Sequence, residues 1–165
     1  MTAMNPASDT TADREVTFTR TFDAPAPLLF AAWSTPEHLM QWFGPEGWPL
    51  TLCEVDFRVG GRYRFAMTGP SGEQETPFGG EYLEIVPDKK IVYDDAWESP
   101  GSESMVVTVS FDEQGDGKTL VTMHTLFGSA EMREKHISMG MEEGMASSLD
   151  QLTALVARLQ GAPAS

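Results

Sequence analysis

The segment from Met139 to Leu159, MGMEEGMASSLDQLTALVARL, carries the pattern from which the fold can be deduced. Its apolar side chains recur at spacings of three and four, the period of an α-helix with one buried face. The pattern reaches back to Ser129, a residue type that caps helix N-termini, so we predict one long helix over residues 129–160. Its continuous apolar stripe consists of Ile137, Met141, Met145, Leu149, Leu152, Val156 and Leu159.

The stripe changes in character along this helix. Its second half is built from leucine and valine, as in a packed core, whereas its first half combines methionines with Gly140 and Gly144. A glycine inside a helix costs about 1 kcal/mol relative to alanine, so both glycines need a reason. One reason is a cavity beside the helix, because methionine suits a wall that accepts more than one shape. The alternative is close approach of a strand or loop.

Strand-like runs separated by turn residues fill most of the chain before this helix. One strand begins at Glu15, and six more lie between residues 50 and 127. Two short helices with prolines in their first turns occupy the interval from Asp23 to Gly44. We therefore predict an α+β fold in which a curved antiparallel sheet of about seven strands wraps the long C-terminal helix. The six runs are LTLCEVDF, RYRFAMT, PFGGEYLEIV, KIVYDDAW, SMVVTVSF and TLVTMHTLF.

The alternation within KIVYDDAW (residues 90–97) assigns side chains to the inner face of the sheet. Tyr93, Asp95 and Trp97 share one face, so Asp95 points inward if the aromatic face does. The same reasoning places further rings and thioethers around a concave surface, although each is also a plausible ordinary core residue. These are Phe65, Phe78, Met105 and Met123, with Tyr63, Met67 and Phe127.

The stretch WFGPEGW (residues 42–48) places Trp42, Phe43 and Trp48 around a Gly-Pro-Glu-Gly run that neither a helix nor a strand holds. The rings either close the end of an ordinary core or form the lip of a cavity. The residues of this stretch alone leave both interpretations open.

Length and composition indicate one cytoplasmic domain. A chain of 165 residues can bury a sizeable core without metal or disulfide, and the single Cys53 has no partner for an internal disulfide. We expect a disordered leader (residues 1–13), one domain (residues 14–160) and a flexible tail (residues 161–165). The leader has neither the basic nor the apolar region of a secretory signal, so we predict a cytoplasmic protein.

The charge of the chain limits its partners. With 25 acidic and 11 basic side chains, the net charge is −14, which repels nucleic-acid phosphates and anionic lipid. No apolar run approaches the roughly 20 residues needed to cross a bilayer. We predict no nucleic-acid or membrane partner and a monomer or weak homodimer. The acidic surface serves solubility or, alternatively, a basic partner.

Asp95 is the candidate for acid or base catalysis. A carboxyl group among Tyr93, Trp97 and methionines would have a raised pKa because burial disfavours its charged form. The alternative, which we favour, is a hydrogen bond to a neighbouring hydroxyl or a place at a bulge. His38, His124 and His136 lack metal-ligand spacing, so we expect no metal and no cofactor.

The chain resembles the activator of heat-shock-protein-90 ATPase homologue family of the START-like (SRPBCC) superfamily over about residues 15–160. That resemblance implies a helix-grip fold with a deep apolar cavity, and it places the aromatic loop at the cavity mouth. Many relatives carry tryptophan where this chain has Met145, which implies a softer and roomier wall here. The matching segments are APLLFAAWSTPEHLMQWFGPEGW, DFRVGGRYRF, GGEYLEIVPDKKIVYDDAW and MGMEEGMASSLDQLTALVARL.

Three functions follow from the residues and the resemblance. The leading hypothesis is binding of a small, mainly hydrophobic ligand. A chaperone-modulating or other protein-interaction module is the second, and a cyclase- or hydrolase-like enzyme using Asp95 is the third; we lean against an enzyme. The predicted ligand-binding residues are Trp42, Phe43, Trp48, Phe65, Phe78, Tyr93, Trp97, Met105, Met123, Met141, Gly144 and Met145.

Overall fold

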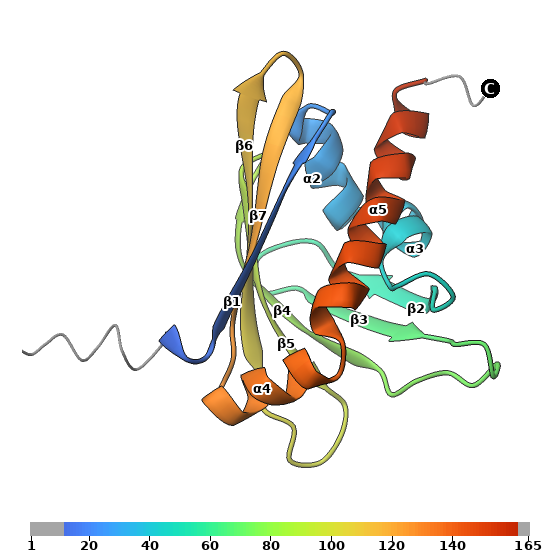
Figure 1. Ribbon diagram of the computed structural model, residues 1–165, viewed down its shortest axis with the longest axis vertical. Helices are drawn as coiled ribbons and strands as arrows, with labels where there is room; N and C mark the ends of the chain where they lie inside the picture. The colour runs from blue at the N-terminus through green and yellow to red at the C-terminus, as the bar shows by residue number, and fades with distance from the viewer. Residues whose placement is uncertain (1–11, 162–165) are drawn as a thin grey trace, which may run out of the picture.

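The computed structural model describes residues 12–161, so most of the predicted leader and residues 162–165 of the predicted tail lie outside the described residues. One curved antiparallel sheet holds seven strands in the order β1-β7-β6-β5-β4-β3-β2. Figure 1 shows the long helix α5 running across the sheet, with α2 and α3 on the same side. The predicted fold class, including two short helices between the first two strands, is confirmed.

Strand pairing follows the order of the chain. From β2 to β7 each strand pairs with the next one in the chain, with the shortest connections after β4 and after β6, and β1 joins the free edge of β7. The register places Asp95 of β5 opposite Met105 of β6. The strands are β1 (Glu15–Phe22), β2 (Leu50–Val55), β3 (Arg62–Met67), β4 (Phe78–Val86), β5 (Lys90–Trp97), β6 (Met105–Gly115) and β7 (Lys118–Leu126), and the helices are α2 (Ala26–Ser34), α3 (Pro36–Trp42), α4 (Ala130–Ser138) and α5 (Met141–Leu159).

The C-terminal segment forms two helices, so the prediction of one continuous helix over residues 129–160 is wrong. Ser129 does cap the start, because its hydroxyl oxygen accepts a hydrogen bond from the Met132 backbone N–H at 3.1 Å. Helix α4 then ends, and Gly140 takes the left-handed conformation with φ of 91° before α5 begins. Residues with a Cβ atom rarely adopt that conformation, so Gly140 fits the break. Its role is therefore a turn between helices.

The two glycines of this segment should respond oppositely to alanine. At Gly140 an added Cβ finds no close neighbour, so the positive φ alone makes Gly140→Ala destabilising by about 1–2 kcal/mol. At Gly144, inside α5, the Cβ would lie 3.6 Å from Pro45 Cγ, an ordinary contact, so Gly144→Ala should stabilise by up to about 1 kcal/mol. Urea unfolding measures both free energies. A neutral or stabilising Gly140→Ala would contradict the helix break.

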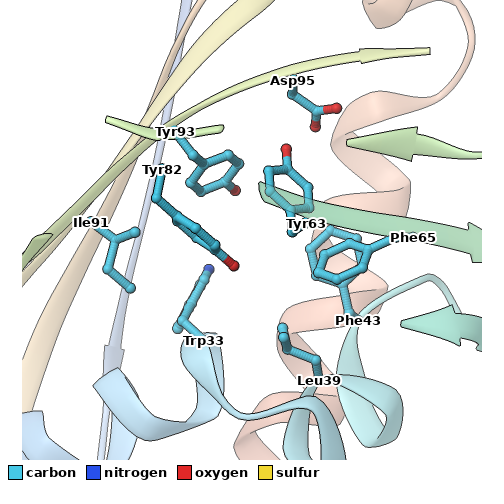
Figure 2. Close-up of a pocket in the computed structure, with 9 residues that line it drawn as sticks. All are labelled: Trp33, Leu39, Phe43, Tyr63, Phe65, Tyr82, Ile91, Tyr93 and Asp95. Carbon is cyan, nitrogen blue, oxygen red and sulfur yellow. The ribbon is translucent and has the colours of Figure 1, made fainter. Parts of the chain in front are cut away.

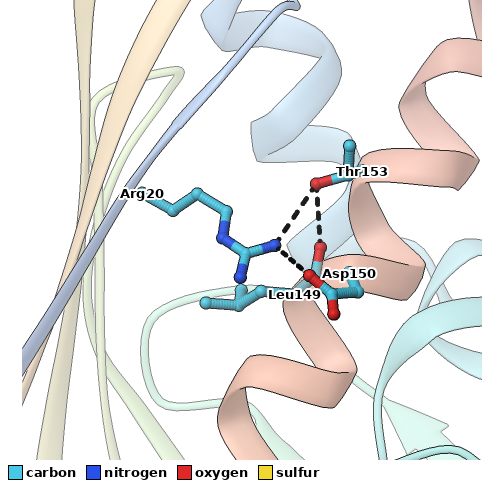
Figure 3. Close-up of polar contacts among 4 residues, drawn as sticks. All are labelled: Arg20, Leu149, Asp150 and Thr153. Carbon is cyan, nitrogen blue, oxygen red and sulfur yellow. Dashed lines mark hydrogen bonds and ion pairs between the residues drawn. The ribbon is translucent and has the colours of Figure 1, made fainter.

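The second half of α5 packs as a solid core against the sheet. Leu152, Leu155 and Val156 are buried, and they belong to one apolar core with residues of β1, β6 and β7 and of the short helices α2 and α3. At the surface, Arg20 of β1 meets Asp150 of α5 at 2.8 Å, with the Thr153 hydroxyl at 3.5 Å (Figure 3). Because Asp150 is largely exposed, this pair adds little stability. The apolar contacts therefore fix α5 on the sheet.

Candidate functional site

An apolar cavity lies between the sheet and the first half of α5. Its volume is about 210 Å³, and the Met123 and Val107 side chains of the sheet face Met141, Gly144 and Met145 of the helix across it. A second space of about 320 Å³ continues toward α4, and a narrow one of about 20 Å³ reaches between the rings of β3, β4 and β5 (Figure 2). Phe43 and Asp95 border all three spaces.

The structure brings most of the predicted site residues to these walls. Besides Asp95, they are Trp42, Phe43, Phe65, Phe78, Tyr93, Trp97, Met105, Met123, Met141, Gly144 and Met145. Strand alternation brings in the sheet residues, and the helical period brings in Met141 and Met145. Whether they contact a ligand stays a prediction.

Trp48 lies elsewhere than expected. Its indole packs over Gly69, just beyond the end of β3, so closely that a Cβ on Gly69 would overlap the ring. The side chain remains 37% exposed. Gly44 and Gly47 both have positive φ, and the resulting turns send residue 48 to the outer side of the loop. Trp48 thus covers backbone at the end of β3.

The rest of the aromatic loop is held against α5 at the cavity mouth. Gln151 of α5 donates hydrogen bonds to the carbonyl oxygens of Gly44 at 2.6 Å and Trp42 at 3.3 Å. The Ser147 hydroxyl oxygen accepts a hydrogen bond from the Glu46 backbone N–H at 2.9 Å. Pro45 and Gly144 both line the cavity. Both explanations for a glycine at position 144 therefore apply, because Gly144 leaves open space beside α5 and lets the loop approach the helix closely.

Trp42 forms the floor beneath this loop. It is only 2% exposed, and its indole Nε1–H donates to the Ala32 carbonyl oxygen at 3.0 Å. Its ring contacts those of Trp33 and Phe43 at centroid distances of 4.7 and 5.5 Å. The two short helices and the loop are thus fixed to one another through a single side chain.

Asp95 is the acidic group of the cavity. Figure 2 shows its carboxyl pointing toward the Tyr63 hydroxyl and away from the strand backbone. Burial raises the pKa of Asp95 to about 7, the hydrogen bond from Tyr63 opposes that shift, and repulsion from Asp94 adds to it. Tyr63 has only one proton, which it also donates to the Asp94 carbonyl oxygen at 2.9 Å, so it cannot satisfy both acceptors at once. Hydrogen bonds therefore compensate poorly for the removal of the Asp95 carboxyl group from water.

The phenols around Asp95 remain hydrogen-bond donors. Burial raises the pKa of Tyr63, Tyr82 and Tyr93 above the ordinary value of a tyrosine. Asp94 itself faces the other way, because its Oδ1 accepts a hydrogen bond from the Glu81 backbone N–H at 2.9 Å. The walls of the three spaces contain no lysine or arginine among residues 12–161. Among the described residues, no lysine or arginine of these walls is therefore available to pair with Asp95.

The other polar candidates lie outside the apolar cavity or at its edge. His124 bonds Glu15 at 2.7 Å on the opposite face of its strand from Met123, and His136 donates from Nδ1 to the Met132 carbonyl oxygen at 3.0 Å. Burial raises the pKa of the Cys53 thiol to about 11, and the charge of Glu37 adds a smaller increase. The raised pKa disfavours a reactive thiolate. Within residues 12–161, no group of three or more His, Cys, Asp or Glu side chains is placed to hold a metal.

Sequence reasoning missed several wall residues. Trp33 sits in a helix whose apolar residues show no distinct stripe, so no signal marked it. Thr125 and Ser148 are buried polar residues of β7 and α5, and their position on the inner faces could have been read from the periodicity of Met123 and Met145. Met132 and His136 come from α4, which only the break at Gly140 brings beside the cavity.

Comparison with known proteins gives one family. Residues 23–157 match the family described as "Activator of Hsp90 ATPase homolog 1-like protein". No curated protein matches this sequence. In the described residues, no helix has both the length and the apolar character needed to cross a membrane.

Solved bacterial structures share the fold over nearly their whole length. A Staphylococcus epidermidis protein is 31% identical, with a TM-score of 0.75 over 88% of this chain and 90% of its own. An Arthrobacter aurescens protein is 28% identical, with a TM-score of 0.81 over 90% of this chain and 88% of its own. The AHSA1 protein of Silicibacter pomeroyi is 26% identical, with a TM-score of 0.71 over 87% of this chain and 97% of its own.

Proposed function

This chain belongs to the family of activator of Hsp90 ATPase homolog 1-like proteins, and on that premise we propose that it binds a small, mainly hydrophobic molecule in the cavity beside α5. The observation that carries the proposal is the contrast along this helix. Leu152 and Leu155 pack solidly on the sheet, whereas Met141, Gly144 and Met145 border open space. One helix thus holds the fold together at one end and leaves room at the other.

The energetics favour an occupant. The space is partly open to solvent, so water can enter it, but its mainly apolar walls offer that water few hydrogen bonds. An apolar ligand that displaces this water gains hydrophobic free energy and contacts with the walls. The methionines can change rotamer at little expense and so fit ligands of different outline.

Size and chemistry define the ligand class. An apolar cavity of about 150 Å³ accommodates benzene, so about 210 Å³ suits one or two fused rings, and the adjoining space toward α4 suits a substituent. Phe43, Trp97 and Tyr93 offer ring faces and edges for stacking. Native mass spectrometry of protein purified gently from its own host, followed by organic extraction, would identify the bound molecule. A stoichiometric small molecule is the expected result.

Filling the cavity should abolish binding. We expect Met145→Trp, whose indole would occupy the space between α5 and β7, to weaken binding of the uncharged dye N-phenyl-1-naphthylamine at least tenfold, as measured by fluorescence titration. The matched control is Met40→Trp, because Met40 of α3 is 45% exposed. Equal dye binding by wild type and Met145→Trp, with both folded by circular dichroism, would count against the proposal, as would the absence of dye binding to the wild type.

The other two functions stay predictions. The interaction module rests on the family description and the acidic charge, and a pulldown at low and moderate salt tests it. The enzyme rests on Asp95, whose raised pKa suits proton transfer near neutral pH. The apolar cavity favours ligand binding over both.

A further inference from the structure

We infer that the ligand carries a cationic amine, which binds the carboxylate of Asp95 among the aromatic rings where the three cavity spaces meet. The inference rests on the proposed function and names the chemical class of the ligand. Its basis is the arrangement of one carboxyl group, several ring faces and the near absence of basic side chains within a single cavity.

The first step is the position of the carboxyl group. Asp95 borders the cavity of about 210 Å³, the space toward α4 and the narrow space between the rings, so a ligand in any of them can reach it. Its nearest protein donor, the Tyr63 hydroxyl, also donates to the Asp94 carbonyl oxygen at 2.9 Å. An ammonium group would bring both charge and hydrogen-bond donors to a carboxylate that the protein leaves poorly satisfied.

The second step is the ring environment. Phe43, Tyr63 and Tyr93 line the walls beside Asp95, with Trp33 beyond them (Figure 2). Trp97 extends that lining toward α4. The faces of such rings attract cations within about 6 Å, with the greatest effect where water is excluded. Both the rings and the carboxylate therefore favour a positive charge on the ligand.

The third step is discrimination against other ligands. A carboxylate ligand would meet Asp95 with no lysine or arginine of the wall to neutralise either charge. Among the described residues of these walls, His136, on the side toward α4, is the one basic side chain, and its Nδ1 donates to the Met132 carbonyl oxygen. The net charge of −14 also draws cations toward the protein and repels anions. An amine is thus preferred both on approach and at the site.

A matched ligand series tests this inference. The probes are 2-(2-naphthyl)ethylamine, 2-(2-naphthyl)ethanol and 2-naphthylacetate, which share one ring system and differ in their polar group. Isothermal titration at pH 8 and 150 mM salt should give the amine a Kd at least tenfold lower than that of the alcohol, with the acetate weakest. In Asp95→Asn the amine and alcohol should come within about twofold of each other, with alcohol binding unchanged. Asp112→Asn, which removes an exposed charge from β6, should retain the preference.

The outcomes separate the two proposals. If the alcohol binds as tightly as the amine, the inference is overturned while ligand binding stands. If the amine preference survives in Asp95→Asn, the overall charge of the protein causes it, and the inference is again overturned. If none of the three probes binds wild type and the dye does not bind either, the proposed function falls and the inference falls with it.

Discussion

Trp42→Ala is expected to lower the free energy of unfolding by about 3–5 kcal/mol, because it removes a fully packed indole from beneath the aromatic loop. The substitution deletes the ring contacts with Trp33 and Phe43. It also leaves the carbonyl oxygen of the buried Ala32 without its indole N–H donor, which adds to the loss. Urea unfolding followed by far-ultraviolet circular dichroism measures the change without relying on tryptophan fluorescence.

Trp48→Ala is the matched control for this experiment, since it removes the same side chain from the other end of the same loop. Trp48 is 37% exposed and its ring lies over Gly69, so we expect a loss of only about 1–2 kcal/mol. Trp42→Ala should also abolish dye binding, because Trp42 supports Phe43 at the cavity mouth, whereas Trp48→Ala should leave it intact. Equal losses of stability in the two variants would show that the loop rings contribute alike, contrary to the structure.

The sequence predicted those parts of the fold that have a regular period. Alternation in KIVYDDAW placed Asp95 and Tyr93 on the inner face, and both lie there because a strand turns successive side chains to opposite sides. The helical period likewise placed Met141 and Met145 on the wall. In a regular strand or helix the backbone geometry determines which face each residue occupies. Residue spacing alone is therefore sufficient to predict that face.

The errors occurred where the backbone departs from a regular period. Ile137 and Met141 are four residues apart, so the apolar stripe continues through the break at Gly140 and conceals it. A glycine with positive φ and a glycine inside a helix look the same in a sequence. Within the aromatic loop, Phe43 and Trp48 diverge because of the turns at Gly44 and Gly47, and no periodicity determines such directions.

The stability of the protein and its proposed binding depend on different parts of α5. Leu149, Leu152 and Leu155 of the second half are buried and hold the helix in the core, whereas Leu159, the last residue of the predicted stripe, is 41% exposed. With α5 so fixed, the first half can leave space without loss of the fold. The loop hydrogen bonds from Gln151 reach back from the packed half to the cavity mouth. Substitutions in the Met141 to Met145 stretch should therefore change binding more than stability.

Asp95→Asn should stabilise the ligand-free protein at pH 8 by about 2–4 kcal/mol and have little effect near pH 4. Burial raises the pKa of Asp95 from an ordinary value near 4 to about 7. Between those values the folded protein holds a proton that the unfolded chain has released, so stability falls as the pH rises toward 7. Above pH 7 the folded state carries the charge on a half-buried side chain, and asparagine, which resembles the protonated carboxyl in shape, avoids that charge.

The difference in unfolding free energy between wild type and Asp95→Asn, measured in urea at pH 4, 5, 6, 7 and 8, isolates this group from the other carboxylates. Within the described residues, the titratable groups that share these walls with Asp95 are Tyr63, Tyr82 and Tyr93 from the strands and His136 across the space toward α4. Asp94, whose side chain faces the other side of β5, acts on Asp95 through its charge, and α5 and the aromatic loop contribute no titratable side chain to the walls. Asp112→Asn should show no such rise with pH. If the Asp95→Asn difference in unfolding free energy were constant from pH 4 to pH 8, folding would not raise the pKa of Asp95. A cationic ligand would then have no special reason to bind Asp95.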